Sequence, residues 1–293
     1  MWALLQIELL KIFRRPRTYI SFAAITAMVC IVQVALKFDG ESYLQFLMGS
    51  LKDSIEIPYQ VVLNGYLVCF IILNLLLIHV PLLVALVAGD AIAGEANMGT
   101  LRLLLTRPVS RTQFILMKFA ACVIYTLLLL VWMALLSLFL SIFLFGTNDM
   151  IIARNDVVEQ LQRSDILWRY FAAFAYAAVA LTTVAALAFL LSVFADNSIG
   201  PIVSTISIVI IFTILSEMEI PIYDTTVKPW LFTSHMLAWK GFFYSKSNGQ
   251  GEAIKGSLEN FPAIMRSMSV LLAYIVLFVG SAVMVFRKKD ILS

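Results

Sequence analysis

The stretch Gly89–Lys118, GDAIAGEANMGTLRLLLTRPVSRTQFILMK, interrupts a chain that is otherwise strongly apolar. Long apolar runs lie on both sides of it. Within it, two carboxylates, three arginines and a terminal lysine alternate with a cluster of leucines. A short charged segment between two apolar runs indicates where a membrane-spanning chain turns back. The leucines indicate that this turn is more than a solvated loop.

The composition places the chain in a membrane. Of its 293 residues, 61% are hydrophobic and 13% charged, whereas soluble domains carry about 45–50% apolar and 25% charged residues. Because an apolar helix of about 20 residues crosses a bilayer, we expect one all-α transmembrane domain over residues 1–293. The six predicted spans are Thr18–Leu36, Tyr66–Gly89, Phe119–Phe145, Tyr170–Ala195, Ile199–Ser216 and Met268–Phe286.

The distribution of basic residues predicts the orientation of these spans. Cytoplasmic loops carry the excess of lysine and arginine. The two termini, the loop after the second span and the link after the fourth hold eleven of the 21 Lys and Arg residues, although they are short. Both termini and the opening stretch are therefore predicted to be cytoplasmic, and the loops at 37–60, 146–169 and 217–266 to face outward.

Two flanking segments are predicted to lie at the membrane surface. In residues 1–17, Trp2, Leu5 and Leu9 recur at helical spacing while Glu8 and Lys11 occupy other faces. This pattern indicates an amphipathic interfacial helix that ends near Pro16. The outer segment 217–266 contains KPWLFTSHMLAWKGFFY, whose tryptophans and tyrosine favour the interface between membrane and water.

Polar residues are few within the predicted spans. The second span carries Asn74, His79 and Pro81, and a kink is expected because Pro81 removes a helical hydrogen bond. Asn74 and His79 are candidates for lining a substrate path. The alternative for His79 is a neutral, hydrogen-bonded histidine that faces another helix. The fourth span is rich in alanine, which allows close helix approach and predicts a central position in the bundle.

Several kinds of chemistry have no support in the sequence. The chain has two histidines and no zinc-protease, nucleophile-elbow or phosphate-loop motif. No charged residue lies in the middle of a predicted span, which disfavours an ion-coupled pump. We therefore expect neither enzymatic activity nor a cofactor or metal bound directly by this chain, and no nucleic-acid partner.

The opening stretch itself predicts a docking element. Helix-forming residues from Asp90 to Arg107 end at Pro108, and Ser110 with Gln113 forms a capping-box pattern that begins the third span. Leucines at positions 101, 104 and 105 share one helical face. Such a face binds either a lipid surface or a groove in a partner protein. An ordinary basic loop, the simpler alternative, does not account for GEANMGTLRLLLT.

These residues resemble a known family. GEANMGTLRLLLTRPVSRTQFILMK is similar to the E-x-x-x-G-T-L-x-x-L-L-x-x-P-[VI]-S-R pattern that follows the second span of type 2 ABC exporter permeases. The similarity is greatest to their six-span branch, which includes the permease for nitrous-oxide-reductase maturation. It covers about 25 residues, and the rest of the chain agrees with that family in plan only, with an N-terminal elbow helix and a long outer segment.

The resemblance implies a function and a set of residues. The segment 90–113 would be the coupling helix, which docks into a separate ATPase subunit that binds ATP and Mg, present in two copies. A second permease subunit would complete a homodimer in the bacterial cytoplasmic membrane, and the outer segment would form re-entrant helices. The matching positions are Glu95, Gly99, Thr100, Leu101, Arg102, Leu104, Leu105, Pro108, Ser110 and Arg111.

Two functions stay open at this stage. The chain is either the permease subunit of an ATP-driven exporter, or part of an ABC-type complex that transmits movement to an outer-face partner without moving a solute. A continuous path between two subunits would favour the first. The spans do not identify a substrate, because the same side chains serve for packing and for lining a path.

Overall fold

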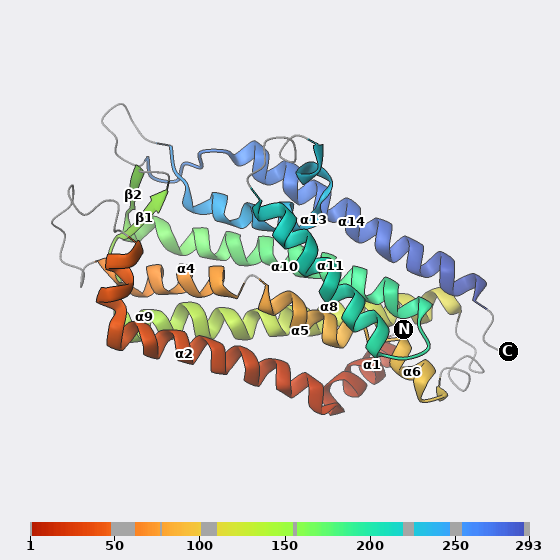
Figure 1. Ribbon diagram of the computed structural model, residues 1–293. Coiled ribbons are helices and arrows are strands. Elements are labelled where there is room, and N and C mark those ends of the chain that lie inside the picture. The colour runs from red at the N-terminus through yellow and green to blue at the C-terminus, as the bar shows by residue number, and fades with distance from the viewer. Residues whose placement is uncertain are drawn as a thin grey trace.

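The computed structural model describes residues 2–47, 62–76, 78–100, 110–154, 157–218, 226–246 and 254–289. Its helices run roughly alongside one another, with a small β-hairpin at one end (Figure 1). Helix α1 and the last turn of α14 lie together at the opposite end. We call these two ends the hairpin end and the N-terminal end of the bundle.

Within these ranges, five helical stretches are long and apolar enough to cross a membrane, so the chain is a predominantly helical, multi-pass membrane protein. The helices are α2 (Pro16–Leu47), α8 (Arg111–Ala134) continuing through η1 (Leu135–Leu140) and α9 (Ser141–Phe145), α10 (Arg163–Phe194), α11 (Ile199–Glu217) and α14 (Phe261–Lys288). Most of these helices begin or end several residues beyond the predicted spans.

The predicted second span is broken. It consists of α4 (Gly65–Leu75) and α5 (His79–Ala88), whose axes differ in direction by 54°. The expected kink near Pro81 is therefore confirmed, because proline cannot donate the helical hydrogen bond at this point. A sixth span exists only if the bent pair is counted as one crossing.

Helix α10 occupies the centre of the bundle, as its alanines predicted. It contacts α5, α8, α11 and α14, and 61% of its most apolar stretch is buried, against 17–33% for the other candidate spans. The hydroxyls of Thr182 and Thr183 bond to backbone oxygens of their own helix, at 2.7 and 3.1 Å. Small side chains on α10 therefore serve close packing.

An irregular π-helical stretch, η1, lies between α8 and α9. Buried Gln33 of α2 donates hydrogen bonds of 2.9 Å to the Leu136 carbonyl and to the Ser141 hydroxyl. A π-helical turn leaves backbone groups without their usual partners, and a side chain from another helix satisfies one of them here. No sequence pattern marks this stretch.

At the hairpin end, the structure differs from two predictions. Residues 146–169 were predicted as an outer loop, but β1 (Met150–Arg154) and β2 (Val157–Leu161) form an antiparallel hairpin in which Met150 pairs with Leu161. Helix α10 then begins at Arg163, seven residues before the predicted span. The hairpin is a local addition to a chain that is otherwise predominantly helical, as predicted. Alternation of apolar and polar residues in MIIARNDVVEQL is too short to have indicated strands by itself.

The predicted outer segment folds as short helices against the bundle. These are η2 (Lys228–Trp230), α13 (Phe232–Met236) and η3 (Leu237–Phe243). Trp230 is 75% exposed, but Phe232, Trp239 and Phe243 are buried, and the last two pack against Phe70 of α4. Most of the aromatic side chains that predicted a membrane-surface helix therefore contact protein instead.

Candidate functional site

The segment after α5 turns through Gly89 and Asp90 into the short helix α6 (Ala93–Asn97) at the N-terminal end of the bundle. It carries two acidic side chains, Asp90 and Glu95, each with only 2% of its surface exposed. A buried carboxylate needs compensating partners, because burial without them strongly disfavours the charged form. Both carboxylates find these partners on helices that are distant in sequence.

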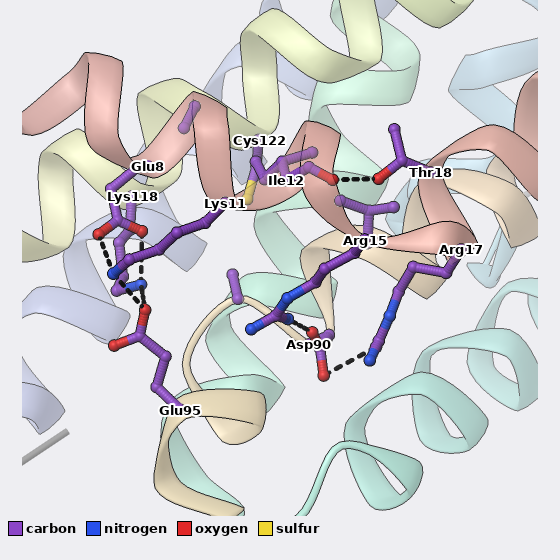
Figure 2. A pocket seen from close by; sticks show the side chains of 13 residues that line it. Glu8, Lys11, Ile12, Arg15, Arg17, Thr18, Asp90, Glu95, Lys118 and Cys122 are labelled. Carbon is purple, nitrogen blue, oxygen red and sulfur yellow. Dashed lines mark hydrogen bonds and ion pairs between the residues drawn. The ribbon is translucent and has the colours of Figure 1, made fainter. Parts of the chain in front are cut away.

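Glu95 belongs to a group of two lysines and two glutamates, Glu8, Lys11, Glu95 and Lys118, which we call the lysine–glutamate quartet (Figure 2). The side chain of Lys11 is 33% exposed, and the other three members are buried. The Lys118 ammonium lies 2.6 Å from Glu95 Oε1 and 2.7 Å from Glu8 Oε2. Lys11 completes the quartet at 2.9 Å from Glu95 Oε1 and 2.8 Å from Glu8 Oε1. The quartet therefore joins α6 to α1 (Trp2–Arg14) and to α8.

In the quartet, the lysines and the glutamates stabilise each other's charged forms. Burial alone would raise the pKa of Glu8, but attraction by Lys118 and hydrogen bonds from both lysines outweigh it, so this pKa lies below its ordinary value. Burial alone would lower the pKa of Lys11, but hydrogen bonds to Glu8 and Glu95 hold it above its ordinary value. The second carboxylate oxygen of Glu95 is buried without a hydrogen-bond partner. Removing one member would leave a buried charge unpaired, which is strongly destabilising.

Asp90 forms a second group, with arginines from the junction of α1 and α2. Arg15 donates a hydrogen bond to one carboxylate oxygen, and the Arg17 guanidinium lies 2.8 Å from the other. The Ser198 hydroxyl at the start of α11 also bonds to Asp90. A Cβ atom at position 94 would collide with the Asp90 carboxylate. Gly94 therefore allows this carboxylate to fold back against α6.

Helix α10 holds the same segment by a hydrogen-bond cap. The buried hydroxyl of Ser192 accepts hydrogen bonds from the backbone N–H groups of Ile92 at 3.0 Å and Ala93 at 2.9 Å. Such N–H groups at a helix start have no partner within their own helix and are usually capped by a neighbouring side chain. Here the cap comes from a residue about one hundred positions away.

A small cavity of about 30 Å³ lies between the quartet and the Asp90 group, lined by side chains of both. This volume accommodates about one water molecule. In the ranges that the structure describes, no three His, Cys, Asp or Glu side chains form a group suited to hold a metal ion. The site is thus built for ion pairing between helices.

The predicted coupling residues divide into three groups. Glu95 faces the bundle instead of the surface, while Gly99 adopts a positive φ of 69° and the Thr100 hydroxyl bonds to the Glu95 carbonyl at 3.3 Å. Five predicted residues lie outside the described part of the chain: Leu101, Arg102, Leu104, Leu105 and Pro108. The helix predicted from Asp90 to Arg107 is not continuous in its first part, because α6 ends at Asn97 and Gly99 has the left-handed conformation that terminates helices.

The predicted capping of the third span by Ser110 is confirmed. Ser110 caps α8 by accepting a hydrogen bond from the Gln113 N–H at 3.3 Å. Arg111 donates to the carbonyls of Arg287 and Lys289, at 3.1 and 2.9 Å. The chain on both sides of positions 101–109 is therefore fixed to the bundle.

The two candidate path residues are not part of this site. Asn74 of α4 donates to the Phe70 carbonyl at 2.9 Å, and His79 of α5 bonds to the Leu75 carbonyl at 3.0 Å. His79 is exposed on the single chain, so it does not face another helix of the chain as the alternative had it. Asn74 therefore bonds within α4, whereas His79 bonds across the break to the last residue of α4.

Sequence reasoning missed most of the partners that hold the site. Lys118 was counted as a charge that anchors the topology, and Glu8 and Lys11 as the solvated face of a surface helix. Their signals were a lysine inside the apolar run that begins at Phe114, and a Glu–Lys pair at i, i+3. At the hairpin end, Asp165 and Arg169 were placed in a loop. Arg169 is fully buried in α10 and bonds to Asp165 and to the carbonyls of Phe242 and Ser257.

Comparison with known proteins gives a family. The family model described as Protein of unknown function (DUF2705) matches residues 19–292. The chain belongs to this family. It is also 31% identical over 120 residues to the protein named Uncharacterized protein YhcI of Bacillus subtilis (strain 168), a match that covers 39% of this chain and 37% of that relative. The match thus spans well under half of the relative's length.

The DUF2705 match covers most of the site. Asp90, Glu95, Lys118 and Ser192 all lie within the matched range, whereas Glu8 and Lys11 precede it. The part of the site contributed by α5, α6, α8 and α10 therefore lies in the region that the family model describes, and α1 completes it from outside that region.

Proposed function

We propose that this chain is the permease subunit of an ATP-binding-cassette exporter, driven by a separate ATPase subunit that docks on positions 95–107. The observation that carries the proposal is the anchoring of this segment. Before it, Asp90 and Glu95 are tied to α1, α2, α8 and α11. After it, Ser110 and Arg111 are tied to the start of α8 and the end of α14.

Because the segment is anchored in this way, its displacement by the ATPase would be passed on to the membrane-spanning helices. A pull on the segment acts through the quartet on α1 and α8, and through Ser192 on α10. A network of buried ion pairs transmits displacement because breaking it would leave unpaired charges. The docking surface is the leucine face that the sequence predicts at positions 101, 104 and 105, and ATP with Mg binds to the partner chain. The proposal places the chain in the bacterial cytoplasmic membrane as a homodimer.

One observation favours the alternative, an ABC-type complex that transmits movement to a partner at its outer face. Helix α10 touches the coupling segment through Ser192 at one end, and at the other end Arg169 fixes the segment that follows α11. A single central helix therefore links the two ends of the bundle. Movement of α10 would reach an outer-face partner whether or not a solute crosses.

The proposal is tested by purifying the full chain from membranes of its own organism and identifying an ABC ATPase that copurifies with it. Leu101→Asp and Arg102→Asp are expected to reduce both the recovery of the ATPase and its activity in lipid nanodiscs. Lys255→Asp, an exposed position at the hairpin end, is the matched control. Unchanged assembly and turnover in the Leu101→Asp and Arg102→Asp variants would contradict the docking role. Full ATPase coupling without solute-dependent stimulation, together with a copurifying outer-face protein, would favour the alternative.

A further inference from the structure

A second cavity lies at the hairpin end, far from the coupling segment, and has a volume of about 310 Å³. Its inner wall consists of buried aliphatic side chains: Leu44, Val62, Leu67, Ile71, Ile151 and Ile152. We call this cavity the hairpin-end pocket. Its volume is in the range of small-molecule binding sites.

The pocket results from a bend in α2. At Asp39 the backbone leaves helical geometry (φ −131°, ψ 26°), and the following turns cross the end of α4 (Figure 1). Gly40 allows this crossing, because a Cβ atom there would meet the side chain of Leu63. Strand β1 closes the space from the other side with Ile151 and Ile152. Three separate elements therefore enclose the pocket.

The lining selects an apolar ligand. Eight of the ten side chains are aliphatic or phenylalanine, and the polar ones are Tyr43 and Asn74. A charged or strongly hydrogen-bonding group would lose its hydration here and gain few partners. The pocket is thus suited to a hydrocarbon chain.

The position of the pocket identifies the source of that chain. Its walls include α2 and α4, both parts of candidate membrane spans, and its rim carries Leu75, which is 50% exposed on the outside of the bundle. The inner residues are recessed, each at most 7% exposed, so the surface is a hollow and not a flat lipid-facing patch. We propose that the hairpin-end pocket binds one acyl chain of a membrane phospholipid. This proposal does not rest on the transport function.

The test uses the full chain in nanodiscs of phosphatidylethanolamine and phosphatidylglycerol, with a fraction of lipid that carries a photoactivatable diazirine on its acyl chain. Labelled peptides are mapped by mass spectrometry after irradiation. The expected result is labelling around Leu67–Leu75 and Ile151–Ile152 that is several times stronger than on the exposed face of α14, and that excess unlabelled lipid suppresses.

Ile71→Trp fills the pocket and is expected to reduce this labelling severalfold. Val276→Trp, on an α14 position that is 72% exposed, is the control and is expected to leave it unchanged. If Ile71→Trp does not fold, Ile152→Phe at the strand decides the same question. Pocket labelling no stronger than that of α14, or unaffected by the filling variants, would overturn the proposal. A pocket occupied by another segment of this chain would give that result.

Discussion

The Ser192 hydroxyl, in the last turn of α10, accepts a hydrogen bond from the backbone N–H of Ile92 at 3.0 Å. It also accepts the neighbouring N–H of Ala93 at 2.9 Å. Two helix-start donors, which have no partner within α6, thus depend on one side chain of the central helix. This relationship ties the orientation of the proposed coupling segment to α10.

Ser192→Ala is expected to loosen α6 without disturbing the bundle. Loss of a helix cap costs about 1 kcal/mol, and two buried donors would lose their acceptor. Hydrogen exchange of the amides of residues 92–97 is expected to accelerate, while those of α10 stay protected. Thr182→Val is the matched control, because the Thr182 hydroxyl bonds only within its own helix, to the Ala178 carbonyl. Equal exchange at residues 92–97 in both variants would contradict the role of Ser192.

Lys118→Met is expected to destabilise the chain by about 3–5 kcal/mol, the usual cost of breaking a buried ion pair. Glu8 and Glu95 would be left as buried carboxylates with only Lys11 between them. Thermal unfolding in detergent measures the loss.

The double variant Lys118→Met with Glu95→Gln is expected to recover part of this stability, because it removes the carboxylate charge that Lys11 alone does not balance. Together with the unmodified chain and the single variant Glu95→Gln, these two variants form a double-mutant cycle that isolates the coupling between Lys118 and Glu95. Strictly additive effects would show that the two side chains do not depend on each other.

Features that arise from local chemistry could be predicted from the sequence. Pro81 cannot donate a helical hydrogen bond, so the break in the second span follows from that residue alone. Ser110 with Gln113 marked the start of α8, and the alanines of α10 marked the central helix. Each of these depends on residues within a few turns of one another.

Features that depend on which surfaces meet could not be predicted. Periodicity separated the faces of α1, but it did not show that the face with Glu8 and Lys11 packs against Lys118, more than one hundred positions away. The π-helical stretch is stabilised by Gln33 of another helix, and nothing in its own leucines marks it. Ser192 lies among apolar residues as many packing serines do. Only the fold brings it to α6.

Acid is expected to weaken the quartet. The pKa of Glu8 lies below its ordinary value because Lys118 and Lys11 favour the carboxylate. A depressed pKa contributes stability that is present above the ordinary value of 4.5 and is lost as the pH falls through the value in the folded chain. Glu8→Gln is therefore expected to lower the melting temperature at neutral pH, and the difference from the unmodified chain is expected to shrink toward about pH 4 and below.

The other carboxylates of the site, Glu95 and Asp90, are present in both proteins. The difference between the unmodified chain and the Glu8→Gln variant therefore isolates Glu8. A difference that stays constant from neutral to acid pH would show that the charge of Glu8 contributes nothing.

The crossing of α4 and α9 is expected to depend on the absence of a side chain at Gly65. A Cβ atom there would lie 2.5 Å from Cα and 2.6 Å from N of Ile142, and 2.6 Å from the Ser141 carbonyl oxygen. These are backbone atoms and cannot rotate away. Gly65→Ala is therefore expected to destabilise the chain by about 1–3 kcal/mol, the usual cost of overpacking. It would also displace Asn64, which caps α4 and bonds to the Asp149 carbonyl.

Gly280→Ala on α14 is the matched control, because no atom lies within 4 Å of its added Cβ. Alanine is a better helix former than glycine by about 0.5–1 kcal/mol, so this variant is expected to be neutral or slightly more stable. Thermal unfolding in detergent compares the two. If both substitutions shifted the melting temperature in the same direction and by the same amount, the close contact at Gly65 would not govern the stability of this end of the bundle.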